Sequence, residues 1–238
     1  MTQNGRVLVI GGTRGTGRLA VELLLRVGFS VRVLARDPVK AREAFGDRVE
    51  VVQGDVTRAE TLHPAVRGAD HVVLTAAVTT RPAPERLVRA TVFDGTVNVL
   101  EAARAVAFRG RLVYMSALGT TRRSALGFLL NLAKGNTLEW RRRAEEEIRR
   151  SGMDYTIVHA GILNDEPAGR RAIRVTQQRL PLSPRYRISR GDVAGILVHA
   201  LREPRAERAT IDVAWGRGEP IRDASILFRE VVPDPANA

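Results

Sequence analysis

Val7-Leu8-Val9-Ile10 followed by Gly11-Gly12-Thr13-Arg14-Gly15-Thr16-Gly17 is the stretch of sequence that decides the fold. An apolar run of strand length enters a glycine-rich turn, and an amphipathic segment over residues 19–27 follows at once. Strand, phosphate loop and helix in this order are typical of a dinucleotide-binding βαβ unit. The first amides of such a helix, with the positive end of the helix dipole behind them, face an anion.

Three glycines of this loop have separate expected roles. Gly11 permits the tight turn after the strand, Gly15 lets the backbone approach a pyrophosphate, and Gly17 allows the helix to pack closely against the strand. Turns and helix caps also use glycine, so the strand and helix on either side carry the prediction. The residues predicted to hold the cofactor here are Gly11, Thr13, Arg14, Gly15 and Thr16.

The end of the second expected strand predicts which dinucleotide is bound. Residues 31–35 form an apolar run that ends in Arg36-Asp37-Pro38. A carboxylate at this position favours a free ribose 2′-hydroxyl, whereas an arginine pairs with a 2′-phosphate. Arg36, helped by Arg14, therefore favours NADP(H) over NAD(H). The alternative is that both are surface arginines in an arginine-rich chain.

Composition sets the broad class. The 238 residues suit one domain, and 44% hydrophobic with 27% charged residues is ordinary for a globular chain. The first strand begins almost at the first residue, so we expect no signal or transit peptide, and no apolar run approaches the ~20 residues of a membrane span. Cysteine is absent, which excludes disulfides and thiolate sites. A cytoplasmic location and no membrane contact are expected.

The net charge of +12 raises the question of nucleic-acid binding. Lys40 and Lys134 are the only lysines, and arginines are spread along the whole chain. Residues 141–143 are arginines and residues 145–147 are glutamates, which predicts three i,i+4 ion pairs on a solvated helix face. No aromatic residues alternate with basic ones, so nucleic-acid binding is not expected. The four histidines lack the spacing of metal ligands, and no metal is expected.

Strand and helix signals alternate through the chain and predict a single α/β domain, a Rossmann-like doubly wound parallel sheet with helices on both faces. Strands are expected at residues 7–10, 31–35, 49–52, 70–75, 112–115, 155–158 and 210–213, and helices at residues 19–27, 85–107, 136–150, 192–201 and 221–229. Ser189 is the expected N-cap of the fourth of these helices. Residues 1 to about 163 form the expected cofactor-binding core, and residues 164–238 form a small substrate-side C-terminal elaboration with one short strand at 173–175.

The chain resembles the short-chain dehydrogenase/reductase superfamily, and in particular its atypical, NmrA-like branch with biliverdin/flavin reductase-like proteins. Besides the glycine loop, the resemblance rests on Gly54-Asp55-Val56-Thr57, on Ser116 after the fifth strand, and on residues 141–163 and 188–201. It covers about residues 5–215. The resemblance implies that Asp55 and Val56 hold the adenine and that Thr75, Ala76 and Ala77 line the adenosine side. It places His159, Ala160, Gly161 and Ile162 near the nicotinamide.

The departure from that family concerns catalysis. Reductases of the superfamily generally use a Tyr-x-x-x-Lys pair, in which the lysine holds the nicotinamide ribose and lowers the tyrosine pKa. Alignment through the flanking residues places Thr137 at the tyrosine position and Arg141 at the lysine position. An aliphatic hydroxyl is no comparable acid, and arginine donates hydrogen bonds but no proton near neutral pH. Arg141 is thus either a ribose ligand or a surface partner of Glu145. Ser116 is a further candidate for orienting a substrate carbonyl.

Three functions fit this sequence. The first is an NADPH-dependent reductase of a flavin- or quinone-like acceptor, which takes its proton from water and needs no tyrosine. The second is a non-catalytic, NmrA-like NADP(H) sensor or assembly factor that acts through a regulatory protein partner. The third is a nucleotide-sugar epimerase or dehydratase. The sequence predicts neither the acceptor nor the oligomeric state.

Overall fold

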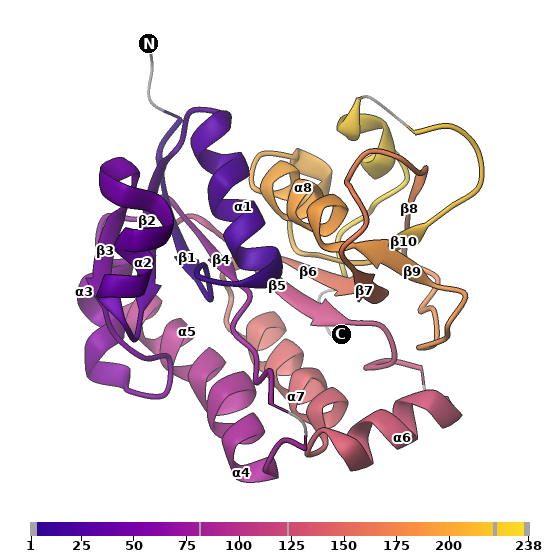
Figure 1. The fold of residues 1–238 in the computed structure, drawn as a ribbon, viewed down its shortest axis with the longest axis horizontal. Helices are drawn as coiled ribbons and strands as arrows, with labels where there is room; N and C mark the ends of the chain where they lie inside the picture. Colours follow the sequence, from indigo (N-terminus) through magenta and orange to yellow (C-terminus); the bar gives the residue numbers. More distant parts are fainter. Residues whose placement is uncertain (1–3, 81, 123, 221–222, 236–238) are drawn as a thin grey trace.

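The computed structural model describes residues 4–80, 82–122, 124–220 and 223–235. A central sheet with helices on both faces dominates the molecule (Figure 1). The strands in spatial order are β3 (Glu50–Gln53), β2 (Ser30–Ala35), β1 (Arg6–Ile10), β4 (His71–Leu74), β5 (Arg111–Ala117), β6 (Asp154–Ala160), β10 (Ala209–Trp215) and β8 (Ile173–Thr176). Every pair is parallel except β10 with β8. The predicted Rossmann-like α/β fold is therefore confirmed.

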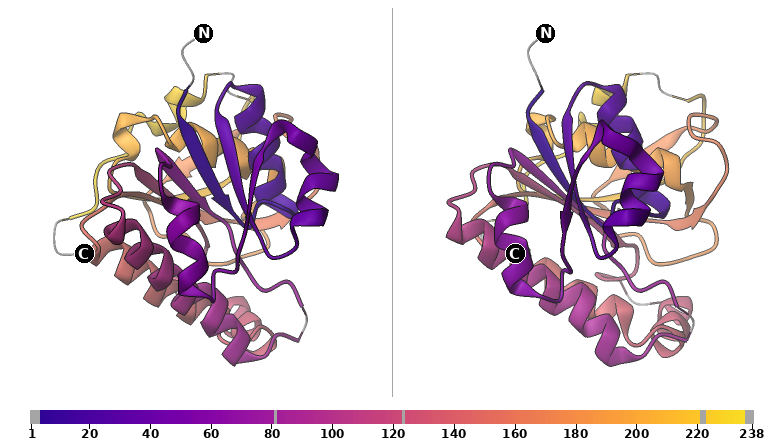
Figure 2. Two further views of the ribbon diagram at one scale, coloured as in Figure 1. Left: turned by 90° about the vertical axis from the view of Figure 1, so that its left-hand side faces the viewer. Right: turned by 60° about the vertical axis from the view of Figure 1, so that its left-hand side comes forward.

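Two layers of helices cover the two faces of the sheet (Figure 2). The first layer contains α1 (Gly15–Arg26), α2 (Pro38–Phe45) and α8 (Arg190–Ala200). The second contains α3 (Leu62–Val66), α4 (Glu85–Val88), the π-helical turn Arg89–Asp94, α5 (Gly95–Ala105) and α7 (Thr137–Arg150). Alternate residues of each strand point to opposite faces, so Val7 and Val9 pack against the first layer while Leu8 and Ile10 pack against the second.

Several boundaries differ from the prediction. The helix expected at residues 85–107 is divided by the π-helical turn, where the Thr96 hydroxyl donates to the Val92 carbonyl. The helix expected at residues 221–229 is only a 3₁₀ turn over Ala224–Phe228, and residues 221–222 lie outside the described part. Short elements that were not predicted are α2, α3, α6 (Ala125–Ala133) and the 3₁₀ turns Gly46–Arg48, Ala59–Thr61 and Pro204–Ala206. Ser189 caps α8 as expected, accepting from the Asp192 amide.

The C-terminal segment adds to the main sheet and forms a second, smaller one. The predicted strand at 173–175 is β8, which pairs antiparallel with β10 at the sheet edge. In addition, β7 (Ile162–Asn164) pairs with β9 (Arg187–Ser189), which brings the chain from β9 past the carboxyl end of β6 and into α8. This route places residues 185–190 beside the carboxyl edge of the parallel sheet, where Rossmann folds bind their ligands.

Helix α6 leaves large apolar side chains uncovered. Phe128, Leu129 and Leu132 are mostly exposed, while Leu126 and Leu130 pack against the buried residues Leu118, Leu138, Leu180 and Leu182. In Figure 1, α6 extends away from the sheet beyond the start of α7. Among the described residues, no helix has the length and apolar content needed to cross a membrane.

Candidate functional site

The glycine loop after β1 is a cradle that side chains would fill. Gly11 has φ +87°, and a Cβ there would lie 2.8 Å from the Ala76 amide nitrogen. A Cβ on Gly17 would lie 2.2 Å from the Gly11 carbonyl oxygen, so α1 packs against the loop only because residue 17 is glycine. Thr75 fixes the loop from β4, since its hydroxyl donates to the Ile10 carbonyl over 3.1 Å. The glycines therefore let the loop pack tightly against β4 and α1, in the position at which the sequence predicts a pyrophosphate.

Gly15 is the part of the loop that faces outward. It is exposed with φ +51°, and the nearest atoms to a Cβ built there belong to the side chain of Arg190, at 3.7 and 3.8 Å. Arg14 precedes it in extended conformation and is exposed, while Thr16 is buried in the first turn of α1. The start of α1 and the side chain of Arg190 thus lie beside one position at Gly15, which suits an anion. Thr13 is half-buried in the turn itself.

At the carboxyl end of β2, Arg36 is exposed and Asp37 is engaged elsewhere. The Asp37 carboxylate caps α2, accepting from the amides of Val39 and Lys40 at 3.1 and 3.3 Å. The Lys40 ammonium lies 3.0 Å away, and these hydrogen bonds hold the pKa of the Asp37 carboxyl below its usual value. Because Asp37 serves as the helix cap, Arg36 is the exposed charged side chain at this strand end, and its contact with the 2′-phosphate of NADP(H) stays a prediction.

The carboxyl ends of β3 and β4 carry further predicted cofactor residues. Asp55 accepts from the amide and hydroxyl of Thr57, each at 2.9 Å, which fixes the turn after β3. Val56 is buried against Gly95, where a Cβ would lie 2.7 Å from a Val56 methyl group, and Asn98 donates to the Val56 carbonyl over 3.0 Å. The sequence reasoning missed the supporting roles of Gly95 and Asn98. Ala76 and Ala77 follow Thr75 into the loop and are increasingly exposed.

Helix α7 carries the residues at the tyrosine and lysine positions. Thr137 is the first residue of α7 and is half-buried, after Asn136 in left-handed conformation. The Arg141 guanidinium donates to the Met115 carbonyl at the end of β5 over 2.8 Å. Arg141 therefore binds the sheet edge, and the expected surface pair with Glu145 is wrong. Of the three ion pairs expected in this helix, Arg142 with Glu146 is present.

Glu145 belongs to a buried network that the sequence reasoning did not predict. Ser116, His159 and Asp212 occupy one row across β5, β6 and β10, because the strand register pairs Ser116 with His159 and His159 with Asp212. Glu145 projects onto this row from α7. The Ser116 hydroxyl donates to Glu145 over 2.5 Å, and the two ring nitrogens of His159 lie 3.0 Å from Glu145 and 2.9 Å from Asp212.

The network is an imidazolium between two carboxylates. Burial alone would lower the pKa of His159, but the carboxylates of Glu145 and Asp212 outweigh it and raise that pKa to about 9. Burial alone would raise the pKa of Glu145, but the charge on His159 and the hydrogen bonds from His159 and Ser116 lower it. The side chains of Glu145 and His159 are only 0% and 2% exposed, so each charge depends on its ion-pair and hydrogen-bond partners inside the protein.

This geometry bears on two of the predicted site residues. The Ser116 hydroxyl has one proton and donates it inward to Glu145, so in this arrangement it orients Glu145. The His159 ring likewise faces the network, with the Thr120 hydroxyl 3.2 Å from one nitrogen. Of the segment predicted near the nicotinamide, Ala160 and Gly161 are buried and Ile162 is half-buried. A Cβ on Gly161 would lie 2.5 Å from the Tyr186 carbonyl oxygen, so the segment around Tyr186 closes over this strand end.

A tyrosine lies in β5 close to the site, but its hydroxyl is buried and cannot protonate a substrate. Tyr114 on β5 is 1% exposed, and burial raises its pKa to about 12 although the nearby Arg141 charge opposes this. A phenol held this far from water with so high a pKa does not replace the missing tyrosine of the superfamily.

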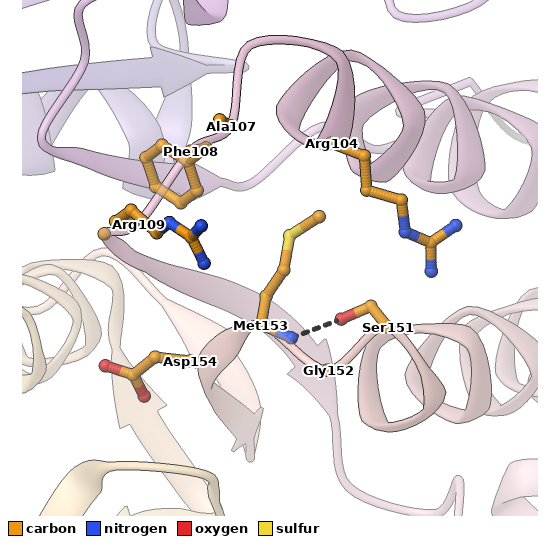
Figure 3. A pocket seen from close by; sticks show the side chains of 9 residues that line it. Arg104, Ala107, Phe108, Arg109, Ser151, Gly152, Met153 and Asp154 are labelled. Carbon is orange, nitrogen blue, oxygen red and sulfur yellow. Dashed lines mark hydrogen bonds between the residues drawn. The ribbon is translucent and has the colours of Figure 1, made fainter.

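A hollow lies beside the amino-terminal ends of β5 and β6 (Figure 3). It has a volume of about 420 Å³ and is lined by residues at the ends of α5 and α7 and the starts of β5 and β6, namely Arg104, Ala107, Phe108, Arg109, Gly110, Ser151, Gly152, Met153 and Asp154. Parallel α/β sheets bind dinucleotides at the carboxyl ends of their strands, so this hollow is separate from the candidate site.

The fold and the glycine cradle define a Rossmann-type dinucleotide-binding protein. The profile of the NAD(P)H-binding family matches residues 11–204, and the chain belongs to this family. Sanguinarine reductase from Eschscholzia californica is 26% identical, over 94% of this chain and 95% of the relative. The photosystem II assembly factor Ycf39 of Synechocystis is 27% identical, over 91% of this chain and 66% of the relative.

Solved structures confirm the fold. A provisionally named NAD-dependent epimerase/dehydratase from Bacillus halodurans superposes with a TM-score of 0.79 at 23% identity, covering 94% of this chain and 99% of its own. A short-chain dehydrogenase/reductase from Veillonella parvula, solved in complex with NADP, gives a TM-score of 0.70 at 18% identity, covering 91% and 97%. The predicted membership of the NAD(P)-binding Rossmann group is thus confirmed, as is the use of a nicotinamide dinucleotide.

Proposed function

We propose that this protein is an NADPH-dependent reductase of a flavin- or quinone-like acceptor that works without a Tyr-x-x-x-Lys pair. The observation that carries the proposal is the state of the three predicted catalytic residues. Thr137 offers an aliphatic hydroxyl, Arg141 is bound to the Met115 carbonyl, and the Ser116 proton is donated to Glu145. None of these groups is a proton donor suited to carbonyl reduction near neutral pH.

The reaction class follows from this lack of an acid. Bound NADPH supplies a hydride, and an acceptor that is protonated by water afterwards needs only to be held against the nicotinamide. The balance is one hydride from NADPH and one proton from solvent for each acceptor reduced. The protein's residues then bind, orient and partly exclude water, and Arg141 remains available for one hydrogen bond to the nicotinamide ribose.

The surroundings of the site favour a flat apolar acceptor. Leu118 follows β5 directly, and together with Leu138, Leu180 and Leu182 it forms a buried cluster beside the ends of β5 and β6. Half-buried apolar residues, Ile162 and Tyr186 among them, border this cluster. The half-buried residues, supported from behind by the buried leucines, offer dispersion contacts and few hydrogen bonds, which suits the face of a ring system. The name of sanguinarine reductase states a reductase activity for a relative of similar length.

A second candidate is a non-catalytic NADP(H)-binding protein that acts through a partner. Two observations favour it: α6 exposes Phe128, Leu129 and Leu132, and the relative Ycf39 is named as an assembly factor. A nucleotide-sugar epimerase or dehydratase is the third candidate, favoured by the name of the Bacillus halodurans structure. Against this third candidate, Thr137 stands at the position of the tyrosine on which such enzymes would depend. The cytoplasmic location and the absence of nucleic-acid and membrane partners stay predictions.

The decisive experiment follows NADPH absorbance after mixing with FMN, riboflavin and a series of quinones. A reductase of the proposed kind oxidises NADPH with a rate that saturates in acceptor, and Thr137→Ala keeps that rate within about threefold because Thr137 gives no proton. Tight NADPH binding without oxidation would contradict the proposal and favour the partner-binding alternative. A fall of a hundredfold or more in Thr137→Ala would also contradict it, because Thr137 would then take part in the chemistry.

A further inference from the structure

Arg190 is the side chain that lies closest to the outward face of the phosphate loop. It is the first residue of α8, and its Nε and Cδ atoms are 3.7 and 3.8 Å from the position of a Cβ on Gly15. Helices α1 and α8 pack side by side, which brings the start of α8 to the start of α1 (Figure 1). The side chain of Arg190 is 31% exposed, so its guanidinium is neither buried in the core nor free in solvent.

The guanidinium of Arg190 is held by a weak partner. Its Nη1 atom lies 2.7 Å from the Oδ1 atom of Asp165, and the Asp165 side chain is 85% exposed. An ion pair with so exposed a carboxylate contributes little free energy, because water screens the attraction and Asp165 loses side-chain entropy. A stronger anion that comes close to Gly15 can therefore displace Asp165 from Arg190.

The loop that carries Asp165 does not depend on this ion pair. Further along the same loop, the Gly169 amide donates to the buried Asp192 carboxylate over 2.8 Å. Ala168 packs against Gly191, where a Cβ would lie 2.8 Å from the Ala168 methyl group. Because these contacts fasten the loop to the first turn of α8, exchanging the partner of Arg190 changes one side chain and leaves the loop in place.

We propose that Arg190 binds the pyrophosphate of the dinucleotide and that Asp165 competes with the cofactor for the Arg190 guanidinium. Arginine matches phosphate oxygens with a planar fork of N–H donors, and a pyrophosphate carries more charge than one carboxylate. The glycine at position 15 leaves the space beside the Arg190 side chain open for that anion. The inference extends the NAD(P)H-binding property of the family to a residue far from the glycine loop in sequence, and it does not depend on the proposed reductase activity.

The proposal predicts opposite effects for the two partners, measured as the NADP⁺ dissociation constant by isothermal titration calorimetry. Arg190→Ala loses charge-assisted hydrogen bonds, so binding weakens about ten- to a hundredfold. Asp165→Asn removes the competitor, so binding tightens about two- to fivefold. The Asp165→Asn effect disappears in the Arg190→Ala background, because Asp165 acts only through Arg190. Arg190→Ala also reduces the dependence of binding on salt.

Arg171→Ala is the matched control. Arg171 pairs with Glu166 in the same loop over 3.0 Å and stacks on Trp215, so this variant removes a neighbouring arginine–carboxylate pair and leaves Arg190 intact. Its NADP⁺ affinity stays within about twofold of the parent chain, and unfolding midpoints without ligand identify any variant that loses its fold. An unchanged affinity in folded Arg190→Ala, or weaker binding in Asp165→Asn, would overturn the proposal.

Discussion

The parent chain is expected to lose stability as the pH rises from about 6.5 to about 9, and the variant His159→Gln is expected not to show this loss. The pKa of His159 rises from 6.5 in the unfolded chain to about 9 in the fold. Each unit is worth about 1.4 kcal/mol, so protonation of His159 stabilises the fold by about 3 kcal/mol. Because the folded pKa is the higher one, this stabilisation is complete below pH 6.5 and is lost as the pH rises through 9.

The charges around His159 set the size of the effect. Glutamine keeps a hydrogen-bonding group but leaves Glu145 and Asp212 without the cation between them, and an uncompensated buried charge costs about 3–5 kcal/mol. We therefore expect the difference in unfolding free energy between the parent and His159→Gln to be largest near pH 6.5. This difference should be about 3 kcal/mol smaller near pH 9. The lowered pKa of Glu145 acts at lower pH, because that stabilisation is lost only as the pH falls below the usual glutamate range.

Urea unfolding at a series of pH values measures this difference. His63→Gln is the control, because His63 on α3 lies outside the network and contacts Arg67. It should keep the pH dependence of the parent. If His159→Gln does not fold, NMR titration of the histidine rings in the parent gives the His159 pKa directly. A stability difference that stays constant across this pH range, or a His159 pKa at or below 6.5, would refute the reasoning.

Three further predictions concern the glycines, the choice of cofactor and the source of the proton. Gly17→Ala should lose NADPH binding and at least about 2 kcal/mol of stability, because its Cβ would lie 2.2 Å from the Gly11 oxygen. Gly195→Ala, where a Cβ on α8 meets open space, should raise the free energy of unfolding by up to about 1 kcal/mol in urea. A Gly17→Ala variant more stable than Gly195→Ala would contradict the glycine argument. Arg36→Asp should weaken NADPH binding about ten- to a hundredfold and improve NADH binding, and unchanged NADPH affinity would refute the role of Arg36. Tyr186→Phe should leave the rate of flavin reduction unchanged in stopped-flow assays, whereas a large loss would identify Tyr186 as the acid.

The parts of the fold that the sequence predicts are those with a local physical cause. The apolar runs of the central strands and the glycines of the first loop carry their reasons in the residues themselves, and both are found where expected. Asp37-Pro38 is also a local signal, an N-cap followed by proline at the first helical position, and it marks α2. Because the same residues also indicate cofactor choice, this signal for α2 is easily missed. Strands of three residues, such as β7 and β9, are too short for periodicity to indicate.

The buried network could not be predicted because it depends on the strand register. Ser116, His159 and Asp212 lie in three strands that are far apart in the chain, and only the pairing of β5, β6 and β10 aligns them. A shift of one residue in any pairing would turn one of these side chains to the other face of the sheet. In sequence Glu145 belongs to a run of charged residues typical of a helix surface, whereas on α7 it faces the sheet and is buried. One signal in the sequence does point to the network, namely the polar residue Asp212 within an apolar strand, between Ile211 and Val213.

The network also gives Ser116 a role that does not depend on a tyrosine and a lysine, whose positions are occupied here by Thr137 and Arg141. A serine hydroxyl donates one hydrogen bond, and here the acceptor is Glu145, whose negative charge is in turn needed to balance His159. Releasing Ser116 to a substrate would leave the fully buried Glu145 with one hydrogen bond fewer, at a cost of about 1–3 kcal/mol. Ser116 is thus held in a structural role, and under the proposed reductase function the site would contribute binding and orientation of the two reactants.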